Sequence, residues 1–346
     1  MEKLPEKITG LGMMDIRPAA AAPAALGLYL TLAVCLYHPY LNSFKPIDFF
    51  FLFNSAIGAL GCFVITMRWV SVFWAALLAG AVYGFSPYAL AFAAYHPFAG
   101  LAIAATPWLF TPAVFWKCRH RSCETPANRH ETIPVAIITA ALFALPFIVI
   151  ATAFWTFAQP FAGPFFPLPN ISPAHTNLIS LIAPTAIDSR FAFSFYHLPL
   201  AAAVMGVFMY ISIHRLGPLL AATAGLIFAY CDPILQTSPV VWGLIPMLFM
   251  SVLIGLGIEG LALASRPDKK WIMLCFLTMV CLTVFTCWHG YYIATSMYAL
   301  ATAISLCVFL MANANIRLHG IRWLLLTLAF AIDIILTARL IVDNIR

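Results

Sequence analysis

Residues 323–342 read WLLLTLAFAIDIILTARLIV, a run of mostly apolar residues that decides the kind of fold to expect. A helix rises about 1.5 Å per residue, so a run of this size would be about 30 Å long, which matches the hydrocarbon core of a bilayer. Only two charged side chains interrupt it, those of Asp333 and Arg339. The segment therefore predicts a membrane-spanning helix.

The rest of the chain has a similar composition. Its 346 residues are 63% hydrophobic and 9% charged, whereas about a quarter of the residues of a soluble domain are charged. A soluble protein is excluded on this ground. We expect an all-α, polytopic bundle of about eleven transmembrane helices forming a single domain over residues 1–346. The predicted spans are 19–37, 48–67, 69–88, 97–116, 133–158, 197–214, 216–231, 240–265, 271–288, 291–311 and 322–342.

Basic residues collect on one side of these spans. Of the 18 in the chain, 14 fall on the side that holds the N-terminal segment 1–18 and the basic loop 117–132, and the opposite side holds Lys45, Arg190 and Arg346. Positively charged loops stay in the cytoplasm. The pattern predicts a cytoplasmic N-terminus, an external C-terminus and a long external loop over 159–196. It is typical of a multi-pass protein of a bacterial-type inner (plasma) membrane.

The net charge of +6 comes mainly from the cytoplasmic side. We expect it to contact anionic lipid headgroups, and no dense basic and aromatic patch predicts a nucleic-acid partner. In the basic loop, Cys118, His120, Cys123 and His130 are residue types that bind zinc, but their spacing matches no standard finger. No metal site is predicted there.

Away from the end positions of the predicted spans, three charged residues occur inside them: Glu259, Asp333 and Arg339. Such residues are costly in lipid and are candidates for function. Asp333 and Arg339 are six positions apart, about 240° of helical rotation, so they do not share a face. We therefore expect Asp333 to have a partner on another helix or to be protonated. Its role would be either a hydrogen bond between helices or a part in substrate or proton binding.

A second set of candidates lies at the external ends of the spans. Carboxylates and imidazoles there could bind a divalent cation or act as a general base, although they come from different loops without ligand-like spacing. Arg190, the only basic residue of the long loop, could pair with a phosphate. The set consists of Asp48, Asp188 and Asp232 with His38, His96, His175, His197 and His289.

Four segments carry a family resemblance. Residues 54–95 predict a helix, a short basic turn and a small-residue helix that ends in Phe85-Ser86-Pro87. Residues 172–200 lead from the external loop into the next span, residues 239–261 form a later glycine-containing span, and the final span contains Asp333. In this order, the segments resemble the YfhO-like proteins and related polytopic members of the GT-C glycosyltransferase class.

The resemblance implies a transfer reaction at the external face, in which a sugar leaves a polyprenyl-phosphate donor for an acceptor of the cell envelope. It also implies an acidic base in the first external loop, where Asp48 is the nearest carboxylate of this chain. His175, Asp188, Arg190 and Asp232 would contact the substrate. The family's acidic motif and surface helices are missing from this loop.

Two alternatives stay open beside a transferase. The chain could be a non-catalytic integral subunit of a larger membrane complex, which fits the scarcity of polar residues inside its spans. It could instead be a transporter that uses Asp333 and Glu259 on a proton or substrate path.

Overall fold

The computed structural model of the chain describes residues 18–43, 49–90, 97–121, 132–161, 196–212, 217–230, 239–264, 268–313 and 319–345. Every regular element within these ranges is a helix. The helices are α1 (Pro18–Tyr37), the 3-10 helix η1 (His38–Ser43), α2 (Phe49–Thr66), α3 (Phe73–Gly84), α5 (Pro97–Arg121), α6 (Thr132–Phe161), α8 (His197–Ser212), α9 (Gly217–Tyr230), α10 (Pro239–Trp242), α11 (Leu244–Leu263), α12 (Lys269–Trp288), α13 (Tyr292–Asn313) and α14 (His319–Ile345). The all-helical expectation is therefore confirmed for the described residues.

Each predicted span overlaps at least one helix of the structure, and the span 240–265 overlaps two, α10 and α11. Five of these helices are long and apolar enough to cross a membrane, over Ala21–Leu41, Leu244–Leu263, Lys269–Trp288, Tyr292–Asn313 and Gly320–Asp343. Six other helices have shorter apolar stretches among the described residues, of 10–17 residues each: α2, α3, α5, α6, α8 and α9. The chain has the fold of a helical membrane protein, and five of its helices meet the length for a span.

The predicted span 69–88 is a helix only over its middle part. Residues before Val72 form a turn, and α3 ends where Phe85 follows Gly84. Ser86 then starts a new helical turn, because its Oγ accepts a hydrogen bond from the backbone N–H of Ala89 at 3.1 Å. Pro87 takes the first position of that turn, where its missing N–H costs nothing. The Ser86-Pro87 pair is therefore a helix start rather than a span end.

Helix α11 lies at the centre of the bundle, with 18 of its 20 residues buried. It packs on α8, α3 and α9. Two glycines let it approach α8 closely: a Cβ on Gly257 would lie 1.7 Å from the carbonyl oxygen of Ala202, and a Cβ on Gly206 would lie 1.8 Å from that of Leu253. Small residues at such crossings are how membrane helices bring their backbones together.

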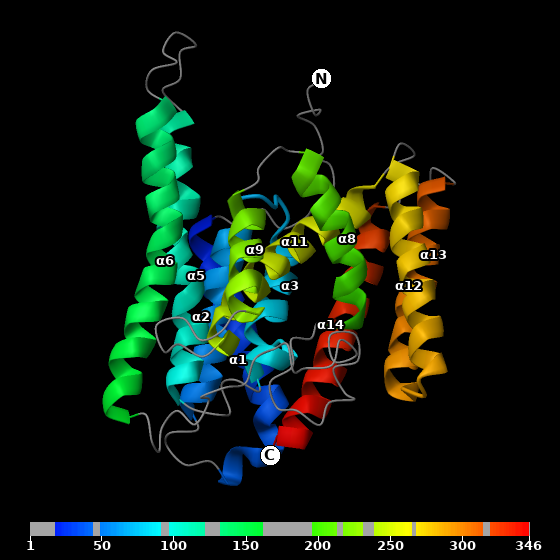
Figure 1. Cartoon of the computed structure of the whole chain (residues 1–346). Helices are drawn as coiled ribbons and strands as arrows, with labels where there is room; N and C mark the ends of the chain where they lie inside the picture. Colours follow the sequence, from blue (N-terminus) through cyan, green and yellow to red (C-terminus); the bar gives the residue numbers. More distant parts are fainter. Residues whose placement is uncertain are drawn as a thin grey trace.

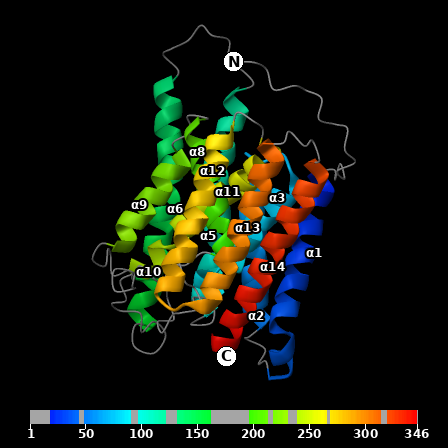
Figure 2. The same cartoon turned by 90° about the vertical axis from the view of Figure 1, so that its right-hand side faces the viewer.

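The first and last helices, α1 and α14, contact each other at one end of the bundle. Arg339 on α14 donates a hydrogen bond to the carbonyl oxygen of Leu36 on α1 at 2.6 Å, and Tyr40 donates to Asp343 at 2.8 Å. Arg339 also lies over the Tyr40 ring, 5.6 Å from its centroid. Figure 2 shows α1 and α14 side by side. Since their C-terminal ends are in contact, the two helices run parallel.

Helices α12 and α13 form a hairpin at one edge of the bundle, opposite α6 (Figure 1). Two threonine pairs join them: Thr283 with Thr302, Oγ1 to Oγ1 at 3.1 Å, and Thr286 with Thr295 at 3.2 Å. The turn between the helices includes Gly290 with φ of 76°, a conformation that favours glycine. The hairpin contacts the rest of the bundle through α8 and α14.

Candidate functional site

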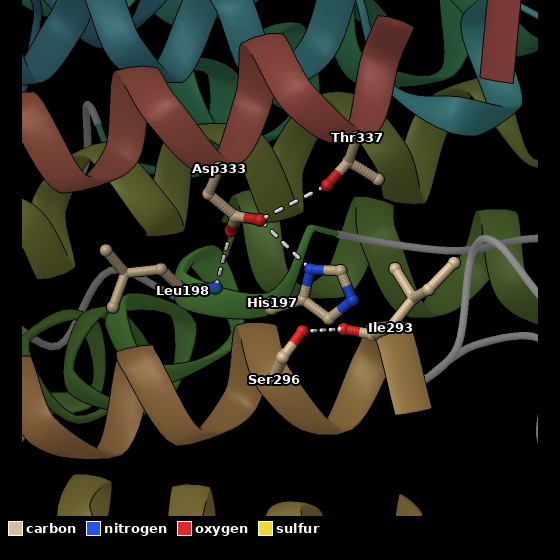
Figure 3. Close-up of polar contacts among 6 residues, drawn as sticks. All are labelled: His197, Leu198, Ile293, Ser296, Asp333 and Thr337. Carbon is tan, nitrogen blue, oxygen red and sulfur yellow. Dashed lines mark hydrogen bonds and ion pairs between the residues drawn. The ribbon is translucent and has the colours of Figure 1, made fainter. Parts of the chain in front are cut away.

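The strongest candidate site is an ion pair between two buried side chains. Nδ1 of His197, the first residue of α8, lies 2.9 Å from Oδ1 of Asp333, in the middle of α14 (Figure 3). His197 is fully buried and Asp333 is 3% exposed. Ten residues, a rise of about 15 Å, separate Asp333 from the contact at Asp343. The pair is therefore well inside the bundle.

Asp333 also binds the start of α8. Its Oδ2 accepts a hydrogen bond from the backbone N–H of Leu198 at 2.8 Å. The first N–H groups of a helix have no partner within the helix, and a negative charge there is favourable. Pro199, next in the chain, has no N–H to satisfy. A carboxylate from another helix thus caps α8.

Three further contacts complete the polar centre. Thr337, one turn after Asp333, donates to its Oδ1 at 3.3 Å. Tyr298 of α13 packs edge to face on the His197 ring, with centroids 4.8 Å apart. Tyr196 donates from its hydroxyl to the carbonyl oxygen of Phe85. The centre therefore joins α8, α13 and α14 to the end of α3.

His197 keeps one nitrogen without a partner. An ionised Asp333 accepts hydrogen bonds only, so a neutral His197 must carry its proton on Nδ1 and present a lone pair at Nε2. Nε2 is buried and has no hydrogen-bond partner among the described residues. Chemically, the pair can hold or release a proton at Nε2, because Asp333 holds the ring in one orientation.

Glu259 is held at a second polar contact, between α11 and the start of α3. Its Oε1 accepts from the backbone N–H of Ser71 at 3.0 Å and also from the Ser71 hydroxyl. The side chain is buried, with 7% exposure. Glu259 and Asp333 have separate partners, so no contact between described residues links them.

Arg322, near the start of α14, binds the C-terminal end of α11. It is 2% exposed, and its Nη1 donates to the carbonyl oxygens of Ala262 and Ala264 at 3.3 and 2.6 Å. The last carbonyls of a helix attract a positive charge. The sequence counts Arg322 among the 14 basic residues of the predicted cytoplasmic side, and the structure adds that its guanidinium is buried against these carbonyls.

Of the predicted intramembrane residues, Glu259 and Asp333 are buried in the bundle, and Asp333 has a partner on another helix, His197. Arg339 points elsewhere, toward Leu36 and Asp343, with Nε 3.2 Å from Asp343 Oδ1. The separation of Asp333 from Arg339, expected from their spacing, is therefore confirmed.

His197 corrects one prediction. The sequence grouped it with the histidines of the external face, but the structure buries it against Asp333. The signal for this was weak: a histidine at the start of an apolar run looks like an interfacial residue, and only the acid inside a distant span suggests a partner. His289, of the same group, is exposed in the hairpin turn.

Of the remaining candidates, His38 is exposed in η1, and the others lie outside the described residues: Asp48, His96, His175, Asp188, Arg190 and Asp232. Among the residues that are described, no group of three or more His, Cys, Asp or Glu side chains is placed to hold a metal ion. The buried contacts of charged side chains among the described residues are therefore those of His197 with Asp333, of Glu259 and of Arg322.

Comparison with known proteins adds no relative, since no family model, curated protein or solved structure matches this chain. The class of the protein therefore follows from the chain itself. Its apolar helices and its polar contacts between helices are those of a helical membrane protein.

Proposed function

We propose that the chain is a GT-C-like integral membrane protein that acts at the external face on a lipid-linked sugar or another substrate of the cell envelope. The proposal includes eleven membrane spans, a cytoplasmic N-terminus, an external C-terminus and a bacterial-type inner membrane. One observation carries it: parts of all four segments that resemble this class lie in contact with one another around the buried polar centre.

The contacts between these segments are specific. Tyr196, from the segment 172–200, donates to Phe85 of the Phe85-Ser86-Pro87 element. Leu198 of the same segment donates to Asp333 of the closing helix. In α11, a Cβ on Gly255 would meet the Cβ of Ala79 on α3 at 3.0 Å. Segments far apart in the sequence thus form one unit, which is what a shared ancestral core requires.

This unit would anchor the end of the long external loop. Residues 159–196 run directly into the contact of Tyr196 with Phe85 and of His197 with Asp333. In the proposed function this loop supplies His175, Asp188 and Arg190 to the substrate. Arg190 would pair with the phosphate of a polyprenyl-phosphate lipid, with or without a divalent cation. Asp48 would act as the base, and Asp232 would contact the acceptor.

Native mass spectrometry on the full chain, extracted from its membrane in mild detergent, tests the proposal. A retained mass of a polyprenyl phosphate would support the transferase, and Asp48→Asn should then abolish sugar transfer. Asp268→Asn, at the start of α12, is the matched control and should leave transfer intact. Transfer that survives Asp48→Asn would refute the role of Asp48, and stoichiometric co-purification of other subunits without lipid would favour a non-catalytic subunit.

A transporter is the second candidate, and the buried pair of His197 and Asp333 favours it. Ionisable pairs inside membrane bundles recur on proton and substrate paths. Glu259, the other residue of this hypothesis, is engaged by Ser71. The test is proton uptake into proteoliposomes that contain a pH-sensitive dye: a transporter loses uptake with Asp333→Asn, whereas a transferase shows no uptake in either form.

A further inference from the structure

We propose that His197 and Asp333 form a proton-binding site, in which Nε2 of His197 takes the proton. The site goes beyond the proposed transferase activity and does not depend on it. Its ligand is the proton alone: an N–H bond forms at Nε2, and the neutral ring becomes an imidazolium. No other bond changes.

The geometry selects Nε2. Asp333 occupies Nδ1 at 2.9 Å, and its own position is held by the backbone N–H of Leu198 and the hydroxyl of Thr337. The ring therefore cannot turn over without losing the ion-pair contact. Nε2 is buried with no partner among the described residues, so its lone pair is the open position for a proton. An acid that orients one ring nitrogen and leaves the other as a base is a recurrent arrangement.

The charges around the pair favour proton uptake. An ionised Asp333 beside a neutral His197 leaves a net negative charge in a low-dielectric interior, which is costly. A proton on Nε2 cancels this charge and keeps every hydrogen bond of the carboxylate. The nearest cation along α14, Arg339, cannot do so, because it binds Leu36 and Asp343.

The other helices packed against α8 place no competing charge there. On α13 the facing group is the phenol ring of Tyr298, and the residue before His197 is Tyr196, bonded to Phe85. The acid of α11, Glu259, binds Ser71, and the lysines of α12 are at its first turn. Among the described residues, Asp333 is the charged group that faces His197.

The experiment is NMR of the full chain in lipid nanodiscs, labelled with ¹⁵N-histidine, between pH 5 and 8, where histidine usually changes charge. His197→Gln identifies the His197 signals by their loss, and His289→Gln, at the exposed turn, serves as the matched control. We expect Nδ1 of His197 to stay protonated throughout and Nε2 to change from bare to protonated as the pH falls.

The wild-type spectrum alone can overturn the proposal. An Nε2 that stays bare, or stays protonated, over the whole range rules the site out, as does a proton that leaves Nδ1 instead. If the wild-type chain shows no sugar transfer but Nε2 of His197 becomes protonated as expected, the transferase is refuted and this site stands.

Discussion

Glu259 on α11 accepts a hydrogen bond at 3.0 Å from the backbone N–H of Ser71, which lies 188 positions earlier and just before α3. Asp333 does the same for the start of α8, and Arg322 binds the carbonyls at the end of α11. Each buried ionisable side chain in this set compensates a helix end on another element. Polar groups inside a bundle must be satisfied by the bundle itself, so these contacts should contribute strongly to stability.

Glu259→Ala should destabilise the protein by about 1–3 kcal/mol, because it removes the acceptor of two hydrogen bonds, from the backbone N–H and the hydroxyl of Ser71. Glu259→Gln keeps an oxygen at the same place and should cost less. Thermal unfolding in detergent, followed by circular dichroism, compares the two variants. Equal losses for Ala and Gln would show that the charge, and not the acceptor, is what matters.

Arg322→Met should lower stability by about 1.5–3 kcal/mol, the usual contribution of hydrogen bonds to a charged group. The methionine keeps much of the apolar volume but offers no donor to Ala262 and Ala264. Arg322→Lys restores a charged donor and should recover part of the loss in the same unfolding assay. A neutral effect of Arg322→Met would contradict the capping role.

The pair of His197 and Asp333 can be tested by a double-mutant cycle. Asp333→Leu alone should cost about 3–5 kcal/mol, since it removes one partner of a buried pair. His197→Leu combined with Asp333→Leu should be less destabilised than the sum of the two single variants. Additive losses would mean that the two side chains do not interact in the folded protein.

Gly257→Ala should be strongly destabilising, by about 1–3 kcal/mol or more, because its methyl group would meet the backbone of α8 rather than a movable side chain. Gly206→Ala should behave alike. Gly27→Ala is the control: a Cβ there meets nothing within 4 Å, so the variant should be neutral or more stable. The retained folded fraction after heating in detergent measures all three.

The membrane topology can be tested by labelling single cysteines with an impermeant maleimide in intact cells. Trp288→Cys, at the hairpin turn where the tryptophan is 86% exposed, should react from outside. Ala127→Cys, in the basic loop, should react only after the cells are opened. The reverse pattern would invert the orientation predicted from the basic residues.

Much of the helix pattern could be predicted from apolar runs alone. The final run was placed correctly because twenty apolar residues have few other structures open to them. The stretch 69–88 was harder to predict, because Ser86 and Pro87 look like residues inside a span. Only the hydrogen bond from the Ala89 N–H to Ser86 Oγ shows that a new helical turn starts there. Hydropathy does not distinguish a helix that continues from one that stops and starts again.

The candidate site could be predicted only in part. The spacing of Asp333 and Arg339 predicted that they do not share a helix face, and it left Asp333 either with a partner on another helix or protonated. That the partner is His197 depends on how α8 and α14 pack, which no local pattern encodes. The burial of Arg322 likewise depends on the end of α11 lying beside the start of α14, a tertiary contact.

The cap that Asp333 places on α8 has a consequence for the order of assembly. His197 leaves the ribosome 136 residues before Asp333 does. During that interval the first N–H groups of α8 and the side chain of His197 lack their acid, while the α12–α13 hairpin is synthesised. The bundle therefore closes late in synthesis, when α14 arrives, and any quality-control factor that detects unpaired polar groups in the bilayer has a long time in which to act.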